Sequence, residues 1–219
     1  MPVRSPYLGS RNGSASGRAI IHNMPAPNDP VAAARAAEAA YDWPEAIRLY
    51  EEALSSLPRE GGAWPAAEAE LLTALGRCYW RNAEARAAWR TVMRAISSCK
   101  QRGDAAAQAR ATTEILQIWG PWERHKMLAD DALAALGDTE PYLRARLLGQ
   151  TDRDDEAFAI AEQHGYDDVL AWRIARASWR ATDEGRLDEA RALTRQAHQA
   201  HDRLGNFEAA AGSLRGMGF

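Results

Sequence analysis

Residues that end helices interrupt this chain at short intervals, and the stretches between them follow the 3.6-residue period of an α-helix. Glycine closes or follows five of these stretches, at positions 103, 137, 165, 185 and 205. No stretch alternates polar and apolar residues with the two-residue period of a strand. Alanine, the strongest helix former, supplies 46 of the 219 residues, whereas aromatic residues make up only 8%. The sequence therefore predicts an all-α fold.

Aspartates mark the expected starts of several helices. Asp29 precedes Pro30, and Asp42 precedes Pro44 with Glu45 at the position that completes a capping box. Asp104 follows Gly103 in the same way. The expected helices cover residues 31–41, 43–57, 66–81, 84–102, 105–118, 123–136, 142–148, 154–164, 168–182 and 187–204, and a further helix starts at Phe207.

Small residues recur at fixed spacings along the second helix of each expected pair. A small, a bulky and a small residue at spacings of 0, 4 and 7 lie on one helix face, where the small side chains let two helices cross closely. Gly76, twelve residues before Ala88, provides the matching small position on a first helix. The small positions are Ala46 and Ala53, Ala88 and Ala95, Ala157, and Ala190 and Ala197.

This pattern resembles the tetratricopeptide repeat (TPR), in which a proline stop such as Pro58 follows the second helix. The fullest match consists of Leu72, Leu75, Gly76, Tyr79, Ala88 and Ala95. The resemblance covers residues 29–219 and implies an α-α superhelix, a TPR-like solenoid of about five antiparallel helix pairs plus a terminal helix. Residues 71–104 are also similar to the TPR-like arrays of large bacterial LuxR-type regulators, which accompany an ATPase or cyclase module. The phosphate-binding pattern GxxxxGK[ST] of such an ATPase does not occur in this sequence.

Charge and composition limit the classes of function. Residues 1–28 lack any periodicity and are predicted to be disordered, with Met24 an alternative start to Met1. The formal net charge of −3 argues against general nucleic-acid binding, and no apolar run is long enough to cross a membrane.

Cys78 and Cys99 are too far apart on consecutive helices to form a disulfide within the hairpin. Free thiols, with no secretory signal, predict a cytoplasmic protein.

The resemblance implies that the first helix of each pair lines a concave face. Arginine and tryptophan, the residue types that dominate binding hot spots, concentrate there on the expected register. Guanidinium groups bind carboxylates and stack on rings, so this face suits a protein segment with acidic and apolar residues. The alternative is that the tryptophans fill gaps between helices and the arginines are plain surface. The expected groove residues are Arg35, Arg77, Trp80, Arg81, Tyr142, Arg146, Trp172 and Trp179.

No set of residues predicts catalysis, so we expect a protein that is not an enzyme and needs no cofactor. His198 and His201 have a spacing that could ligate a metal, but two histidines on a solvated helix face are more common. The sequence predicts a non-catalytic protein–protein interaction module, a scaffold or sensor arm of a bacterial signalling regulator. The alternative is a small-molecule sensor with an aromatic groove. The ligand and the oligomeric state are not predictable from the sequence.

Overall fold

The computed structural model describes residues 29–58, 66–118, 122–206 and 209–210, and these residues form ten helices and no strand. The all-α prediction is confirmed. The helices are α1 (Pro30–Ala39), α2 (Trp43–Ser56), α3 (Ala66–Arg81), α4 (Ala85–Arg102), α5 (Ala105–Ile115), α6 (Trp122–Leu136), α7 (Pro141–Leu148), α8 (Asp154–His164), α9 (Asp167–Asp183) and α10 (Leu187–Arg203). The disordered segment expected over residues 1–28 lies outside the described residues, as does most of the helix expected from Phe207.

The predicted aspartate caps form, but the predicted capping box does not. The side chains of Asp29, Asp42 and Asp104 accept hydrogen bonds from backbone N–H groups in the first turns of α1, α2 and α5. The Glu45 carboxylate instead accepts two bonds from the Arg48 guanidinium, at 2.7 and 2.8 Å. The Asp42 N–H donates to the carbonyl oxygen of Ala37 at 2.9 Å. A charged donor one turn away therefore outcompetes the backbone for Glu45.

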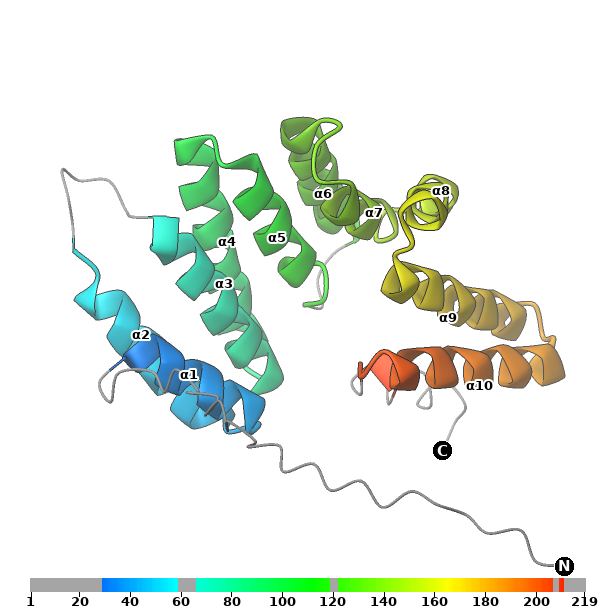
Figure 1. Cartoon of the computed structure of the whole chain (residues 1–219), viewed down its shortest axis with the longest axis horizontal. Coiled ribbons are helices and arrows are strands. Elements are labelled where there is room, and N and C mark those ends of the chain that lie inside the picture. Colours follow the sequence, from blue (N-terminus) through cyan, green and yellow to red (C-terminus); the bar gives the residue numbers. More distant parts are fainter. Residues whose placement is uncertain (1–28, 59–65, 119–121, 207–208, 211–219) are drawn as a thin grey trace, which may run out of the picture.

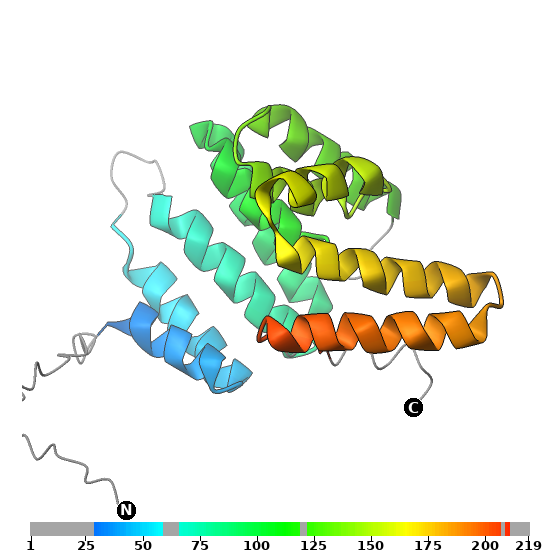
Figure 2. The ribbon, with the colours of Figure 1, turned by 45° about the vertical axis from the view of Figure 1, so that its right-hand side comes forward.

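Consecutive helices pack as five pairs, and the pairs stack in a curved row (Figure 1). Each second helix also contacts the first helix of the next pair, and α3, α5 and α7 contact one another in series. Figure 2 shows from a second direction that α9 and α10 turn back toward α3. The odd-numbered helices consequently share the inner side of the curve.

Helices α3 and α4 cross closely at Gly76. A Cβ atom added to Gly76 would stand 2.3 Å from Cγ2 of Val92, so only glycine fits at this separation. All seven alanines of the repeating pattern are buried, each with at most 6% of its surface exposed. Five of them, at positions 46, 53, 88, 95 and 157, belong to core clusters that join different helices, as the prediction of helix contacts requires.

The core consists of clusters that follow one another along the row. Tyr50 and Leu71 belong to a cluster of α1 to α3, and Ile96 and Ile115 belong to one that joins α3 to α6. Two further clusters join α5 to α8 and α7 to α9. Each pair thus buries its apolar face on its neighbours.

Among the described residues, none of the helices combines the length and apolarity needed to span a bilayer.

Both cysteines are free, as the sequence predicts, and the structure buries them. Burial, reinforced by the charge of Glu38, raises the pKa of the Cys78 thiol to about 12. Cys78 is therefore a neutral packing residue near pH 7, without the thiolate character of a nucleophile.

We expect Gly76→Ala to lower the free energy of unfolding by about 1–3 kcal/mol, because the new methyl group overpacks the α3–α4 crossing. Urea unfolding followed by circular dichroism measures the change. The control is Gly149→Ala, where φ is −66° and the nearest atoms to an added Cβ lie at 3.4 and 3.7 Å. Equal effects of the two substitutions would contradict the close crossing.

Candidate binding groove

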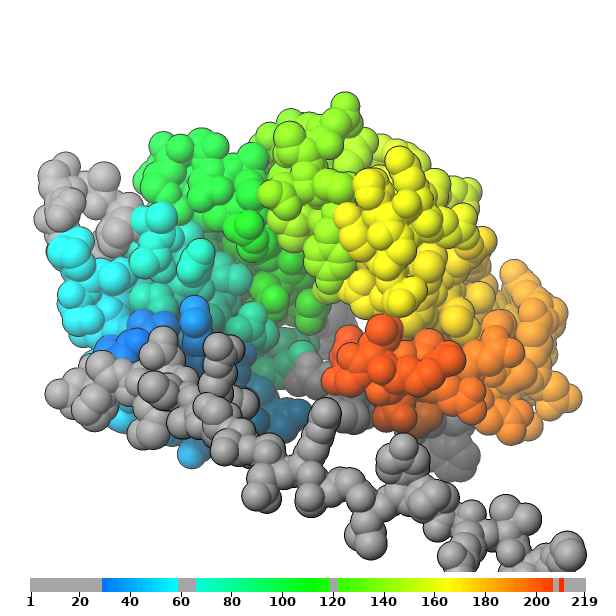
Figure 3. Space-filling view, viewed as in Figure 1, coloured from blue at the N-terminus to red at the C-terminus, as the bar shows by residue number. Residues whose placement is uncertain are grey.

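Two adjoining cavities lie on the inner side of the curve. The larger, of about 810 Å³, is lined by α1, α3, α5 and α7, with Tyr50 added from α2. The smaller, of about 440 Å³, is lined by α3, α5, α7 and α9, by His201 of α10 and by residues that follow α5, α7 and α10. Arg77, Glu114 and Arg146 line both cavities. We call the larger the N-terminal cavity, the smaller the C-terminal cavity and the two together the inner groove. The space-filling view is hollowed between the α3 region and α10 (Figure 3).

The inner groove brings together six of the eight residues that the sequence singles out. Arg35 and Tyr142 line the N-terminal cavity, Arg81 and Trp172 line the C-terminal cavity, and Arg77 and Arg146 line both.

The other two predicted residues, Trp80 and Trp179, line neither cavity. Trp80 packs against the core cluster of α3 to α6, where it fills a gap between helices. Trp179 is 45% exposed and meets the Trp172 ring edge to face, with ring centroids 5.1 Å apart. The alternative of gap filling thus describes Trp80, whereas Trp172 faces the groove.

Arg77 joins three first helices. Its Nε donates to Oε1 of Glu38 on α1 at 2.6 Å, and its Nη1 lies 3.4 Å from Oε1 of Glu114 on α5. The Tyr50 hydroxyl donates to the other oxygen of Glu38 at 2.9 Å. The side chains of Arg77, Glu38 and Glu114 are 19–34% exposed, so the two ion pairs are partly shielded from water. The Arg77 guanidinium therefore ties α1, α3 and α5 together along the floor of the groove.

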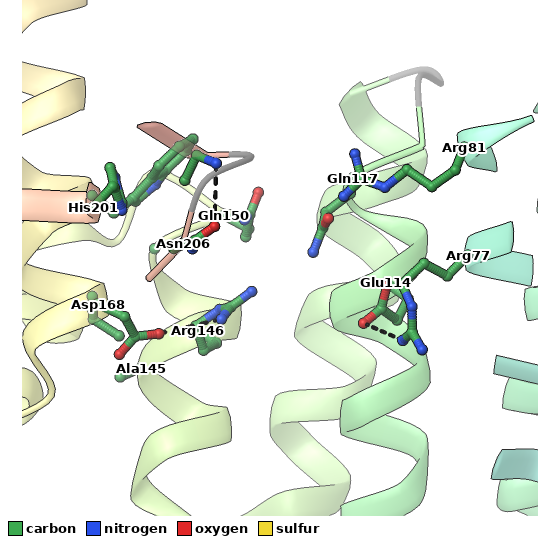
Figure 4. Close-up of a pocket in the computed structure, with 14 residues that line it drawn as sticks. Arg77, Arg81, Glu114, Gln117, Ala145, Arg146, Gln150, Asp168, His201 and Asn206 are labelled. Atoms are coloured by element: carbon green, nitrogen blue, oxygen red, sulfur yellow. Dashed lines mark hydrogen bonds and ion pairs between the residues drawn. The ribbon is translucent and has the colours of Figure 1, made fainter. Parts of the chain in front are cut away.

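A second polar network joins α7 to α9. The Tyr142 hydroxyl donates to Oδ2 of Asp168 at 2.7 Å, and Arg146 Nη1 donates to the Tyr142 oxygen at 3.1 Å. Arg146 Nη1 also lies 3.4 Å from Oδ2 of Asp168. Burial and the bond to Asp168 raise the pKa of Tyr142, which keeps the phenol protonated as a donor. Figure 4 shows Asp168 and Arg146 on one wall, across from Gln117 and Arg77.

Two residues that line the C-terminal cavity, Trp172 and His201, hold buried nitrogen atoms without a hydrogen-bond partner in the described part of the chain. The indole Nε1 of Trp172 and both ring nitrogens of His201 are buried without a hydrogen bond. His201 is only 3% exposed, and this burial lowers its pKa, opposed by the charge of Asp168. A buried polar group without a partner costs about 1–3 kcal/mol. Three such atoms in the wall of one cavity distinguish this end of the groove.

The expectation that His198 and His201 share a solvated helix face is wrong for His201. This side chain of α10 is only 3% exposed and lines the C-terminal cavity. His198 is half-buried, and its Nδ1 contacts the carbonyl oxygen of Ala210 at 3.1 Å. Among the described residues, no group of three or more His, Cys, Asp or Glu side chains is arranged to hold a metal ion.

The sequence analysis did not assign Glu38, Glu114, Asp168 or His201 to the groove, although each lines one or both cavities. A signal for two of them is present, because Glu38 lies 39 residues before Arg77 and Glu114 lies 37 after it. Spacings close to the repeat length place residues at equivalent points of successive first helices. No spacing of this kind identifies Asp168 or His201 in the sequence.

No family model matches the chain, and a comparison with curated proteins gives no match.

We expect Arg77→Met to lower the free energy of unfolding by about 1–2 kcal/mol, because Glu38 and Glu114 lose their shared cation while partly buried. Chemical denaturation measures the loss. Arg48→Met is the matched control: Arg48 also pairs with two carboxylates, Glu45 and Glu52, but 58% of its side chain is exposed. The control should change stability much less, and equal losses would show that the Arg77 pairs contribute no more than surface pairs.

Stability should fall as the pH drops below about 6.5, the ordinary pKa of histidine. The folded-state pKa values of His125 and His201 are lowered by burial, so the unfolded chain binds protons that the folded chain does not. Their contribution is complete above the unfolded pKa and is lost as the pH falls through the folded values. Unfolding free energies between pH 7.5 and 5.5 should show this decline, with a shallower slope in His201→Gln. An unchanged slope in His201→Gln would show that His201 does not contribute to the pH dependence of stability.

Proposed function

We propose that the chain is a TPR-like interaction module that binds an extended peptide segment along the inner groove. The continuity of the groove carries the proposal, since Arg77, Glu114 and Arg146 line both cavities and the lining comes from the same side of successive first helices. An extended segment can lie across repeated helices and contact each in turn. The close crossing at Gly76 and the buried small residues support the assignment to this repeat class.

The lining favours a segment of mixed charge with an acidic excess. Arg77 and Arg146 are already paired within the groove, whereas Arg35 and Arg110 are exposed at the N-terminal cavity. An incoming carboxylate gains most from these exposed guanidinium groups, because it need not displace an existing partner. The charged lining residues are the arginines at 35, 77, 81, 110 and 146 and the carboxylates Glu38, Glu70, Glu114 and Asp168.

In this role the protein is non-catalytic and acts as a scaffold or sensor arm in the cytoplasm, as in the bacterial signalling regulators whose arrays its sequence resembles. A second candidate is a small-molecule sensor. The volume of the C-terminal cavity, about 440 Å³, favours it, because ligand pockets commonly span about 300–1,000 Å³.

Selection from a random peptide library tests the proposed function. Peptides that bind the chain should lose about tenfold or more in affinity to Thr113→Trp, because Thr113 of α5 lines the N-terminal cavity and a tryptophan there would obstruct the groove. Fluorescence anisotropy of the labelled peptides measures the affinity.

The control is Thr91→Trp. Thr91 is a half-buried helical threonine like Thr113, but it lies on α4 and lines a separate cavity with residues of α2 and α3. Its affinity for the peptides should match that of the unmodified chain. A library without any enriched peptide, or equal losses in the two variants, would refute binding in the groove.

A further inference from the structure

We propose that the outer side of the row binds an amphipathic helix of another protein, one that carries acidic residues along one flank. This surface goes beyond the proposed function, because it lies away from the inner groove. A cavity of about 480 Å³ opens between α2 and α4, both of which pack on α3. We call it the outer cavity. Its walls include Glu51 and Leu54 of α2 and Leu72, Leu75 and Tyr79 of α3.

Helix α3 separates the outer cavity from the inner groove. Leu75 and Tyr79 line the outer cavity, whereas Thr73 and Arg77, each two positions earlier, line the N-terminal cavity. Residues two apart on an α-helix point in nearly opposite directions. The two surfaces therefore lie on opposite faces of α3, and a ligand on one leaves the other open.

The charge of α4 differs from that of the other second helices. It has five basic residues, at positions 86, 90, 94, 100 and 102, and no Asp or Glu. Helices α2, α6, α8 and α10 each contain acidic residues. Arg86, Arg90 and Arg94 follow one another at intervals of four, and like charges at this spacing destabilise a helix. Folding alone does not favour such a row, and departures of this kind are typical of functional surfaces.

Two arginines of this row are suited to meet a partner. Arg86 and Arg90 are exposed, and neither pairs with a carboxylate in the part of the chain that the structure describes. Arg94, by contrast, binds the buried Glu68 through Nη2 at 2.6 Å and so holds α4 on α3. We therefore assign recognition to Arg86 and Arg90, of which Arg90 lines the outer cavity.

The outer cavity offers apolar surface beside these guanidinium groups. Leu54, Tyr79 and Ala87 are half-buried in its walls, and Leu72 and Leu75 are almost fully buried there. Apolar side chains of a partner would cover the half-buried residues and remove them from water. An apolar ridge on the partner therefore fits this cavity.

The neighbouring space between α4 and α6 is already bridged by side chains. The Arg124 guanidinium of α6 lies 4.8 Å from the centroid of the Trp89 ring of α4. Lys100 of α4 also forms a 2.6 Å ion pair with Asp131 of α6. Between α2 and α4 the chain instead leaves the outer cavity open. Of these two outer spaces, the one beside Arg90 is thus free to receive an added helix.

The charges around the outer cavity determine the kind of partner. Glu51, on the α2 side, accepts a hydrogen bond from the Tyr79 hydroxyl. A helix with an apolar ridge and one acidic flank can turn that flank toward Arg86 and Arg90 and away from Glu51. A nucleic acid would bring phosphates close to Glu51 and has no aliphatic side chain for the cavity. Exposed ion pairs add little affinity, so the ridge supplies most of the binding and the charges select the partner.

Three synthetic helical peptides of equal length test the proposal. The first has leucines at i, i+4, i+7 and i+11 and a glutamate after each leucine. The second replaces the glutamates by lysines, and the third replaces the leucines by alanines. The first peptide should bind the whole chain saturably, and the other two should bind at least about tenfold more weakly. Fluorescence anisotropy of the labelled peptides measures the affinities.

Two pairs of variants locate the site. Thr91→Trp should weaken binding of the first peptide about tenfold or more, because Thr91 lines the outer cavity, whereas Thr113→Trp in the inner groove should have no effect. Joint replacement of Arg86 and Arg90 by methionine should abolish the preference for glutamate over lysine. Joint replacement of Arg35 and Arg110, exposed arginines of the N-terminal cavity, is the matched control and should preserve it.

Several outcomes would overturn the proposal. The peptide comparison uses the unmodified chain, so equal affinities for the three peptides, or no saturable binding, would refute it whether or not the variants fold. Single-stranded DNA that binds more tightly than the first peptide, and only with Arg86 and Arg90 present, would assign the surface to a nucleic acid. A dimer in sedimentation experiments that Thr91→Trp dissociates would assign it to a second copy of the chain.

Discussion

Each helix pair of this chain buries its apolar face against its neighbours, and the curved row follows from this requirement. The core clusters overlap, so that α3 serves two of them and α5 serves two. Close approach of the helices is possible because small residues stand at the crossings, most strictly at Gly76 against Val92. Bulkier residues there would separate the helices and open the row.

The inner side of the curve is polar because charged side chains of neighbouring first helices lie there and pair with one another. Arg77 and Arg146 therefore have two roles. Arg77 holds carboxylates of α1 and α5, and Arg146 holds a carboxylate of α9 and the phenol of Tyr142 on its own helix. Each arginine also lines both cavities. Arg77 and Arg146 are thus already engaged with other groove residues, whereas Arg35 and Arg110 are exposed at the N-terminal cavity.

Sequence periodicity predicts the helices and the buried alanines of this chain well, because both depend on residues within one helix or one pair. It also assigns Arg77 and Trp172 to the inner face through their register on first helices. It fails for His201, because whether a residue of a second helix is buried depends on how the last pairs curve toward α3. Asp168 could not be paired with Arg146 for a related reason: this contact needs the stacking of separate helix pairs, and the spacing of 22 residues between them does not correspond to a repeat length.

Arg77 has a consequence for the shape of the molecule. Its ion pairs with Glu38 and Glu114 hold α1, α3 and α5 at fixed separations. A ligand carboxylate that took this guanidinium would release two carboxylates that repel each other, and the separations would grow. Larger separations on the inner side would flatten the row, so occupancy of the groove and curvature of the row are thermodynamically linked. Any partner that flattens the row from outside would strengthen binding within the groove by the same factor.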